Sequence, residues 1–453
     1  MGPDTGEKLA PVKTVMANEL WAGNLAKPIR VVSNAGTAFI LDLAQRHYQL
    51  SKEYIGKRRS PESSADLGWN QSICPKPLVI FFMVCTFFAT LPSCSPSRLV
   101  EAARLLDDIN AGTGSSELKA LTTSPLREAV FYGGRDGSGA FAGDLYSSAE
   151  SELAGMVLVP GVARKGKDDP RLVALATTLA RARFMVLVPD LPRLRDLRIG
   201  PEDAAGIAAA ARHLNSRLAG RGKMGITAVS YAVGPAVLAL FEPGMAEKVD
   251  FVLAIGGYYD MTAVITFFTT GYYRKERGKS WRHRYPNAYG KWAFVRGNTG
   301  RLDSRADGAL LAQIAERKLD NMEAHINDLV SKLSPEGKSV HALLVNNDPE
   351  QVETLIAALP SRIAEDIAAL DLTHRNMASL GVSFVLVHGR DDPIIPETES
   401  MALARALAPG RSELFLLESL NHVDPRPAGL TDRLRLLRAI YTVLELRDSV
   451  VVW

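Results

Sequence analysis

Cysteine is scarce in this chain, and charge of neither sign dominates it. Of the 453 residues only three are cysteine, Cys74, Cys85 and Cys94, so neither a disulfide framework nor a cysteine-rich metal site is expected. The 53 basic and 50 acidic residues leave a net charge of +3, too small to indicate a nucleic acid as partner. No repeat period and no long low-complexity run is found, so a repeat architecture is not expected.

The remaining composition is that of an ordinary globular protein. Hydrophobic residues make up 47% and charged residues 23%, and the length allows more than one compact unit. One uncharged apolar run, LVIFFMVCTFFATL, covers residues 78–91. It is shorter than the roughly 20 residues of a comfortable transmembrane helix, but it has the length of the apolar centre of a signal peptide. The following Pro92-Ser93-Cys94 resembles a bacterial lipobox, in which a cysteine becomes lipidated.

Three interpretations of this run stay open. It is the signal sequence of a chain that starts near residue 78, a short membrane segment, or a buried core helix. We therefore expect residues 1–77 to be an N-terminal extension and residues 78–93 to be a signal or membrane segment. The first two interpretations predict an exported or membrane-associated protein, attached through 78–94 as a lipoprotein at Cys94, and the third predicts a cytoplasmic one.

From about residue 127, short apolar strands alternate with helical patterns, which predicts a doubly wound parallel sheet covered on both faces. Residues 94–126 before it read as a linker helix. We expect strands at 127–132, 140–146, 156–159, 184–188, 226–229, 251–255, 384–387 and 414–417. We expect helices at 170–182, 201–218, 232–241, 397–407 and 431–446, with Pro170 and Pro201 in the first turns of theirs.

The interval 260–382 breaks this alternation. About 120 residues between consecutive sheet strands are far more than an ordinary connection needs, and helical patterns occur at 309–333, 349–358 and 361–370. We expect a helical insertion that overhangs the carboxyl ends of the strands, where ligands bind in open α/β sheets. It is either a cap that shapes substrate access or an extra structural layer. The sheet domain itself is expected to comprise 127–259 and 383–450.

Three residues stand in the order nucleophile, acid, base, each after a predicted strand: Ser230, Asp392 and His422. This is the chain order of a serine hydrolase triad on an α/β sheet. A serine hydroxyl needs a base to take its proton, and the base needs a carboxylate to hold its tautomer. Ser230 is flanked by the small residues Ala228 and Ala232, as a sharp turn between a strand and a helix requires.

Other residues compete for two of these roles. Asp391 precedes Asp392 in the same loop, and Asp260 also follows a strand. His422 lies in the last loop between a strand and a helix, where a base is expected, whereas His213 falls in a helical pattern and His388 lies beside the acid loop, which it could support. Ser230 itself could be a helix cap.

Together these residues resemble the α/β-hydrolase superfamily. The matching parts are Pro160-Gly161 after a strand, the serine turn, HGRDDPIIP at 388–396 and Asn421-His422, within 127–259 and 383–447. Ser230-Tyr231 after a strand is also similar to the dienelactone hydrolase and prolyl-oligopeptidase-like branches. The resemblance implies a doubly wound, mostly parallel α/β-hydrolase sheet with a helical cap, and backbone oxyanion donors at Tyr231 and Val162, with Ala163 as the alternative to Val162.

The function expected from these features is a serine hydrolase that cleaves a small-molecule carboxylic ester through an acyl-enzyme, without metal or cofactor. The alternatives are a peptidase or acyltransferase with the same triad, or a non-catalytic, membrane-tethered binding protein. The Gly-rich segment 161–167 lacks the Gly-Lys-Ser/Thr ending of a P-loop. The basic loop with Arg193, Arg195 and Arg198 either favours an acidic substrate or is a solvated surface. The oligomeric state is left open.

Overall fold

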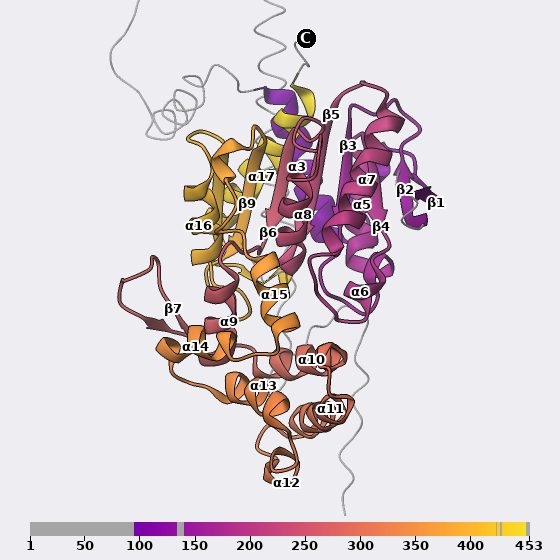
Figure 1. Cartoon of the computed structure of the whole chain (residues 1–453). Helices are drawn as coiled ribbons and strands as arrows, with labels where there is room; N and C mark the ends of the chain where they lie inside the picture. Colours follow the sequence, from indigo (N-terminus) through magenta and orange to yellow (C-terminus); the bar gives the residue numbers. More distant parts are fainter. Residues whose placement is uncertain (1–94, 134–139, 423, 426–427, 450–453) are drawn as a thin grey trace, which may run out of the picture.

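An eight-stranded sheet forms the centre of the molecule (Figure 1). The computed structural model describes residues 95–133, 140–422, 424–425 and 428–449. The strand order is β1-β2-β4-β3-β5-β6-β9-β10. The strands are β1 Leu126–Gly133, β2 Ala140–Ser147, β3 Ala154–Val159, β4 Phe184–Pro189, β5 Lys223–Val229, β6 Phe251–Ile255, β9 Ser383–Gly389 and β10 Ser412–Leu417.

The sheet is mostly parallel, as predicted. Strand β2 runs antiparallel to both β1 and β4, and every pairing from β4 to β10 is parallel. All six residues of β3 and all six of β4 are buried. These strands are apolar throughout because both of their faces are covered.

Helices cover both faces of the sheet. On one face, α7 Asp203–Leu218, α8 Val233–Leu240 and α16 Thr398–Ala406 share a buried apolar cluster with the sheet. On the other face, the cluster includes residues of α3 Pro96–Ala111, α5 Pro170–Arg181 and α17 Leu430–Asp448. The doubly wound arrangement expected from the sequence is therefore confirmed.

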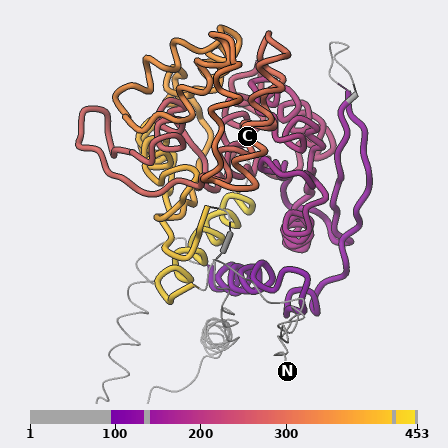
Figure 2. The backbone as a smooth tube through the Cα atoms, turned by 90° about the horizontal axis from the view of Figure 1, so that it is seen from below, coloured from indigo at the N-terminus to yellow at the C-terminus, as the bar shows by residue number. Residues whose placement is uncertain are grey.

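The segment expected to be a linker is part of this packing. Helix α3 buries Ala102, Ala103 and Leu106 in the same cluster as α17, and α4 Glu117–Leu121 follows it. The guanidinium of Arg447 in α17 donates to Glu101 Oε2 at 2.9 Å. Figure 2 shows α3, in indigo, on the opposite side of the view from the orange insertion. This helix belongs to the sheet domain because its apolar stripe needs the face of α17 to cover it.

The apolar run at 78–91 and the lipobox-like Cys94 lie outside the described residues. Within the part of the chain that the structure describes, no helix is both long and apolar enough to cross a membrane. Export and membrane attachment therefore stay predictions.

The insertion between β6 and β9 forms a helical cap at the carboxyl end of the parallel strands (Figure 1). Several of its helices bury an apolar cluster of their own, which includes Trp292, Leu311, Ile314 and Leu329. A pair of two-residue strands, β7 Tyr272–Tyr273 and β8 Arg282–His283, follows the first helix. The helices are α9 Met261–Thr270, α10 Ala288–Asn298, α11 Arg305–Asp320, α12 Asn327–Val330, α13 Pro335–Val345, α14 Val352–Ala357 and α15 Ser361–Leu370.

Three predicted helices differ from the observed ones. Residues 309–333 form two helices, because α11 ends at Asp320 and α12 packs back on the same apolar cluster. Pro349 begins a short 3₁₀ turn ahead of α14. Helix α7 begins at Asp203, so Pro201 lies in the turn before it and not in its first turn. The periodic pattern of apolar residues continues across such turns, because the segments before and after each turn pack on the same core. The pattern alone therefore does not show where the helix begins or ends.

Candidate active site

Ser230 lies in a sharp turn between β5 and α8. Strand β5 ends at Val229, Ser230–Ala232 form a single 3₁₀ turn, and α8 begins at Val233. The φ angle of Ser230 is 58°, a left-handed conformation that is uncommon outside glycine. Such a strained turn exposes a serine hydroxyl at the end of an α/β sheet.

The turn is possible because its surroundings hold very small residues. Ala228 and Ala232, on either side of the serine, are completely buried. A Cβ added to Gly234 would overlap the hydroxyl of Tyr258, and one added to Gly257 would overlap Val233. Helix α8 therefore packs very close to the segment after β6, and a residue larger than glycine at position 234 or 257 would prevent this close packing.

The structure brings Ser230, His422 and Asp392 together. Ser230 Oγ lies 2.7 Å from His422 Nε2, and His422 Nδ1 lies 2.7 Å from Asp392 Oδ2. Because a carboxylate only accepts, the proton on Nδ1 donates to Asp392, and Nε2 is left to accept from the serine hydroxyl. This is the hydrogen-bond order in which a histidine can act as a general base on serine.

Asp392 is held in its charged form and fixed orientation. It is completely buried, and its Oδ1 accepts from the backbone N–H groups of Ile394 and Ile395 at 2.8 and 3.0 Å. Burial alone would raise the pKa of Asp392, but the hydrogen bonds with His388 and His422 outweigh burial and hold this pKa well below its usual range. The carboxylate is therefore ionised when it meets His422.

His388 contacts the Asp392 carboxylate as well. Its Nε2 lies 2.9 Å from the carbonyl oxygen of Ile395, which only accepts, so Nε2 carries a proton. The same nitrogen is 3.4 Å from Asp392 Oδ2, and Nδ1 lies 2.7 Å from the Ser400 hydroxyl. The ring is fully buried. His388 thus joins the acid loop to α16 and orients the carboxylate toward His422.

The competing residues lie elsewhere. Asp391 is exposed. Asp260 caps helix α9, where its Oδ1 accepts from the N–H of Ala263 at 2.9 Å. His213 lies in α7 and stacks on Tyr132, with 5.2 Å between the ring centroids.

The two residues expected to supply oxyanion donors lie beside the serine. Val162 and Tyr231 line the same cavity as Ser230 and His422. Gly161, which precedes Val162, is so close that a Cβ there would be 3.7 Å from Ser230 Cβ. The Tyr231 side chain points away into the core, where its hydroxyl accepts from the N–H of Gly200 at 2.9 Å. Gly200 starts a turn of the loop that borders the cavity.

Comparisons with known proteins find similar structures but no relative in sequence. No protein-family model matches the sequence, and no curated protein matches it. A candidate hydrolase from Legionella pneumophila is similar in structure, with 10% identity and a TM-score of 0.47 over 79% of this chain and 96% of that chain. The rice cell wall degrading esterase LipA from Xanthomonas oryzae has 13% identity and a TM-score of 0.41, over 70% and 89%. The Pyrococcus horikoshii acylaminoacyl peptidase has 10% identity and a TM-score of 0.39, over 71% of this chain and 41% of that chain.

The topology decides the fold. A mostly parallel sheet carries the serine turn directly after β5, and Asp392 and His422 come later in the chain, after β9 and β10. The chain has an α/β-hydrolase fold. The expected fold class, with its helical cap, is confirmed, whereas a fold of this kind hosts many chemistries and names no substrate.

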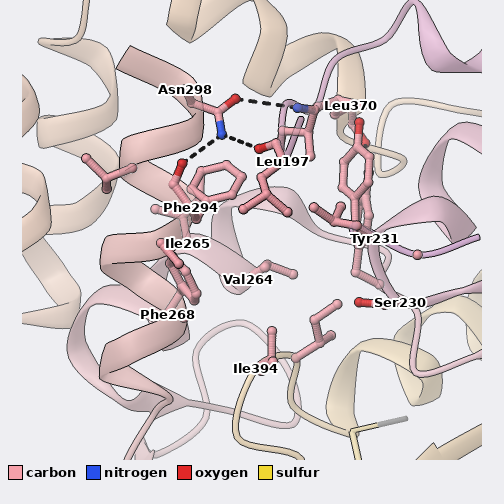
Figure 3. Close-up of a pocket in the computed structure, with 18 of the residues that line it drawn as sticks. Leu197, Ser230, Tyr231, Val264, Ile265, Phe268, Phe294, Asn298, Leu370 and Ile394 are labelled. Atoms are coloured by element: carbon pink, nitrogen blue, oxygen red, sulfur yellow. Dashed lines mark hydrogen bonds between the residues drawn. The ribbon is translucent and has the colours of Figure 1, made fainter. Parts of the chain in front are cut away.

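Within this α/β-hydrolase fold, a cavity of about 640 Å³ opens in front of Ser230 and extends under the cap. Figure 3 shows Ser230 facing a space bordered by apolar side chains of the cap and of the acid loop. Among the residues that line it are Leu197, Val264, Ile265, Phe268, Phe294, Leu343, Leu370 and Ile394. Most of these residues belong to α9, α10, α13 and α15, so the cap supplies most of the wall.

A few polar groups line the cavity as well. Asn298 of α10 donates to the carbonyl oxygens of Leu197 and Phe294 at 2.8 and 2.9 Å (Figure 3). Arg301 is paired with Asp366. These groups are already bonded within the protein, which leaves the cavity with a mostly apolar character. Among the described residues, no group of three histidine, cysteine or acidic side chains is placed to hold a metal ion.

Proposed function

We propose that this protein is a serine hydrolase that cleaves carboxylic esters with apolar acyl groups. The observation that carries the proposal is the unbroken hydrogen-bond chain from Ser230 Oγ through His422 to Asp392, at 2.7 Å in both steps. It opens on an apolar cavity large enough for a small-molecule ligand.

In the proposed reaction, Ser230 attacks the ester carbonyl while His422 Nε2 takes its proton. His422 then donates this proton to the leaving alcohol, and Asp392 stabilises the imidazolium that forms. Water, activated by His422 in the same way, releases the acyl group from Ser230. His388 acts only through Asp392 and is a positioning residue.

The oxyanion of the tetrahedral intermediate would accept from the backbone N–H groups of Tyr231 and Val162. Both residues border the cavity beside the serine, and Gly161 of the loop after β3 lies next to Ser230. Loss of one such donor typically lowers kcat by roughly 100- to 1,000-fold.

The apolar cavity supports an ester rather than a peptide as substrate. An extended peptide needs backbone donors and acceptors along its length, whereas the polar side chains Asn298 and Arg301 at this cavity already bond within the protein. An aliphatic or aromatic acyl group needs only apolar contact. Each buried CH₂ group stabilises binding by about 0.8 kcal/mol.

A fluorophosphonate probe tests whether Ser230 is a nucleophile. We expect the probe to label the wild-type protein and not Ser230→Ala, with both variants folded by circular dichroism. Hydrolysis of a panel of p-nitrophenyl esters by the wild type, lost in Ser230→Ala, then shows the reaction. A folded wild-type protein that the probe leaves unlabelled would overturn the proposal in favour of a non-catalytic binding protein.

A further inference from the structure

A second hollow, of about 500 Å³, lies where the sheet domain meets the cap, and arginine dominates its wall. Arg195 and Arg198 come from the segment around α6 Pro192–Arg195, Arg164 from the loop after β3, and Arg296 from cap helix α10. The remaining lining residues are Asp196, Leu197 and Gly297. The sheet domain and the cap thus both contribute arginines to the wall of this hollow.

The positive charge of this hollow is only partly neutralised. Arg198 pairs with Asp196 at 2.7 Å and Arg195 with Asp190 at 3.2 Å. Arg296 is 3.9 Å from Glu316, at the limit of an ion pair. Arg164 is exposed and has no acidic partner among the described residues. The side chains of Arg195, Arg198 and Arg296 are 38 to 53% exposed, so their N–H groups remain accessible to a ligand.

The shape of the hollow is built into the backbone. Leu197, between Asp196 and Arg198, has a φ of 60°, a conformation that costs free energy outside glycine. The cap holds it there, since Asn298 donates to the Leu197 carbonyl oxygen at 2.8 Å. Gly297 lies so close that a Cβ would be 2.9 Å from the same carbonyl oxygen. The backbone segments that carry the arginines of the loop and of α10 are therefore held close together beside the hollow.

This hollow adjoins the catalytic cavity. Leu197 lines both. Gly161 lies against Ser230, and Arg164 follows it by three residues, a stretch of chain that spans at most about 11 Å. A molecule of moderate size can therefore have its ester carbonyl at Ser230 and another group among the arginines.

We propose that the arginine hollow binds a phosphate group of the substrate, so that the enzyme cleaves amphiphilic esters with an apolar acyl chain and a phosphorylated alcohol part. Several guanidinium groups around one space are the usual recognition of phosphate, because each offers paired N–H donors and a permanent charge. This proposal rests on the proposed function, since the acyl chain is assigned to the cavity in front of Ser230.

A matched pair of substrates tests it: monooctanoylglycerol and the same ester carrying a phosphate on the glycerol. We expect kcat/KM for the phosphorylated ester to exceed that for the neutral ester by about tenfold or more. A single charge-assisted hydrogen bond supplies a factor of about this size. In Arg164→Gln/Arg296→Gln we expect this preference to disappear, with kcat/KM for the neutral ester nearly unchanged. Equal kcat/KM values for the two esters in the wild type would overturn the proposal.

The control variant is Arg212→Gln on α7. Arg212 is similarly exposed and ion-paired with Glu242, but it does not line the hollow. We expect it to keep the full preference for the phosphorylated ester. An equal loss of preference in this control would assign the effect to the overall charge of the protein and would contradict a specific site.

Thermal unfolding with inorganic phosphate separates this proposal from the proposed function. A ligand of the folded state raises Tm, so we expect phosphate to raise the Tm of Ser230→Ala above its value in chloride of equal ionic strength. The rise should be lost when Arg164→Gln/Arg296→Gln is added. If neither ester is cleaved, the rise in Tm still shows whether the anion site exists. A Tm that phosphate does not raise would overturn the proposed anion site. A phosphate-dependent shift together with equal cleavage of both esters would assign the site to free phosphate and refute the headgroup role.

Discussion

Single residues at this site adopt backbone conformations that other residues avoid. Ser230, His422 and Leu197 have φ angles of 58°, 58° and 60°, and all three border the cavity in front of Ser230. Strain of this kind persists only where surrounding contacts hold it, and it gathers at functional sites. Three of the five described non-glycine residues with a positive φ angle therefore lie at the hydrogen-bond chain or beside it, and the other two, Arg183 and Ala219, do not line this cavity.

Replacement of the acid is the sharpest test of one side chain. In Asp392→Asn the amide no longer accepts as a carboxylate, and the hydrogen bonding can select the wrong tautomer of His422. We expect kcat for ester hydrolysis to fall by about 10⁴-fold, measured by steady-state kinetics on a p-nitrophenyl ester.

The adjacent Asp391→Asn serves as the matched control. Asp391 is exposed and lies one residue away in the same loop, so we expect it to retain nearly full kcat. A loss of similar size in both variants would contradict the assignment of the acid to Asp392.

Among the elements, α8 packs so closely against the chain after β6 that glycine should be more stable than alanine at residue 234, the reverse of the usual preference in helices. Alanine normally stabilises a helix interior over glycine by about 1 kcal/mol. In Gly234→Ala, however, the new methyl group would overlap the Tyr258 hydroxyl, which donates to the Leu370 carbonyl oxygen at 3.1 Å. We expect the free energy of unfolding to fall by about 1–3 kcal/mol, measured by urea denaturation.

Gly381→Ala is the control for this substitution. An added Cβ at Gly381 meets nothing within 4 Å, and the residue is exposed. We expect little or no loss of stability there. If the two variants unfold at the same denaturant concentration, close packing of α8 against Tyr258 is not what limits residue 234.

Cap helix α9 should set the length of the acyl group. Ile265 lines the cavity and lies away from Ser230, beside Phe294 and Val264 (Figure 3). In Ile265→Trp the larger side chain fills part of this space, so we expect kcat/KM for octanoyl and longer esters to fall about tenfold or more, since each CH₂ group that is no longer buried costs about 0.8 kcal/mol. Acetyl ester hydrolysis should be nearly unchanged, and an equal loss for both esters would contradict the acyl-pocket assignment.

For the molecule as a whole, one buried carboxyl group joins the cap to the sheet domain. Glu399 of α16 accepts from the N–H groups of Tyr259 and Asp260, where the chain enters the cap, at 3.1 and 2.8 Å. The chain leaves the cap nearby, since the N–H of Leu372 donates to the Tyr259 carbonyl oxygen at 3.1 Å. Burial, together with the charges of Asp260 and Asp371, raises the pKa of Glu399 to about 8.

This raised pKa makes stability fall with increasing pH. Between the ordinary pKa of 4.5 and the folded-state pKa of about 8, the folded protein holds a proton on Glu399 that the unfolded chain has lost. This group should therefore lower the free energy of unfolding as pH rises, by at most about 1.4 kcal/mol per pH unit. Glu399→Gln keeps the acceptor oxygen without the ionisation, so it should become more stable than the wild type toward pH 8. Parallel curves of unfolding free energy against pH for the two proteins would contradict this role.

The amino-acid sequence by itself determined the alternation of strands and helices, the order of Ser230, Asp392 and His422, and the position of the insertion. These follow from local properties: apolar runs, small residues at a turn, and chain order. Only the folded chain distinguished Asp392 from Asp391 as the partner of His422, because a shift of one residue turns a side chain from the core to solvent. It also joined α3 to the core, ended the long helical pattern at Asp320, and brought four arginines from three places in the sequence around one hollow. Those outcomes depend on contacts between segments far apart in the chain, which no local pattern contains.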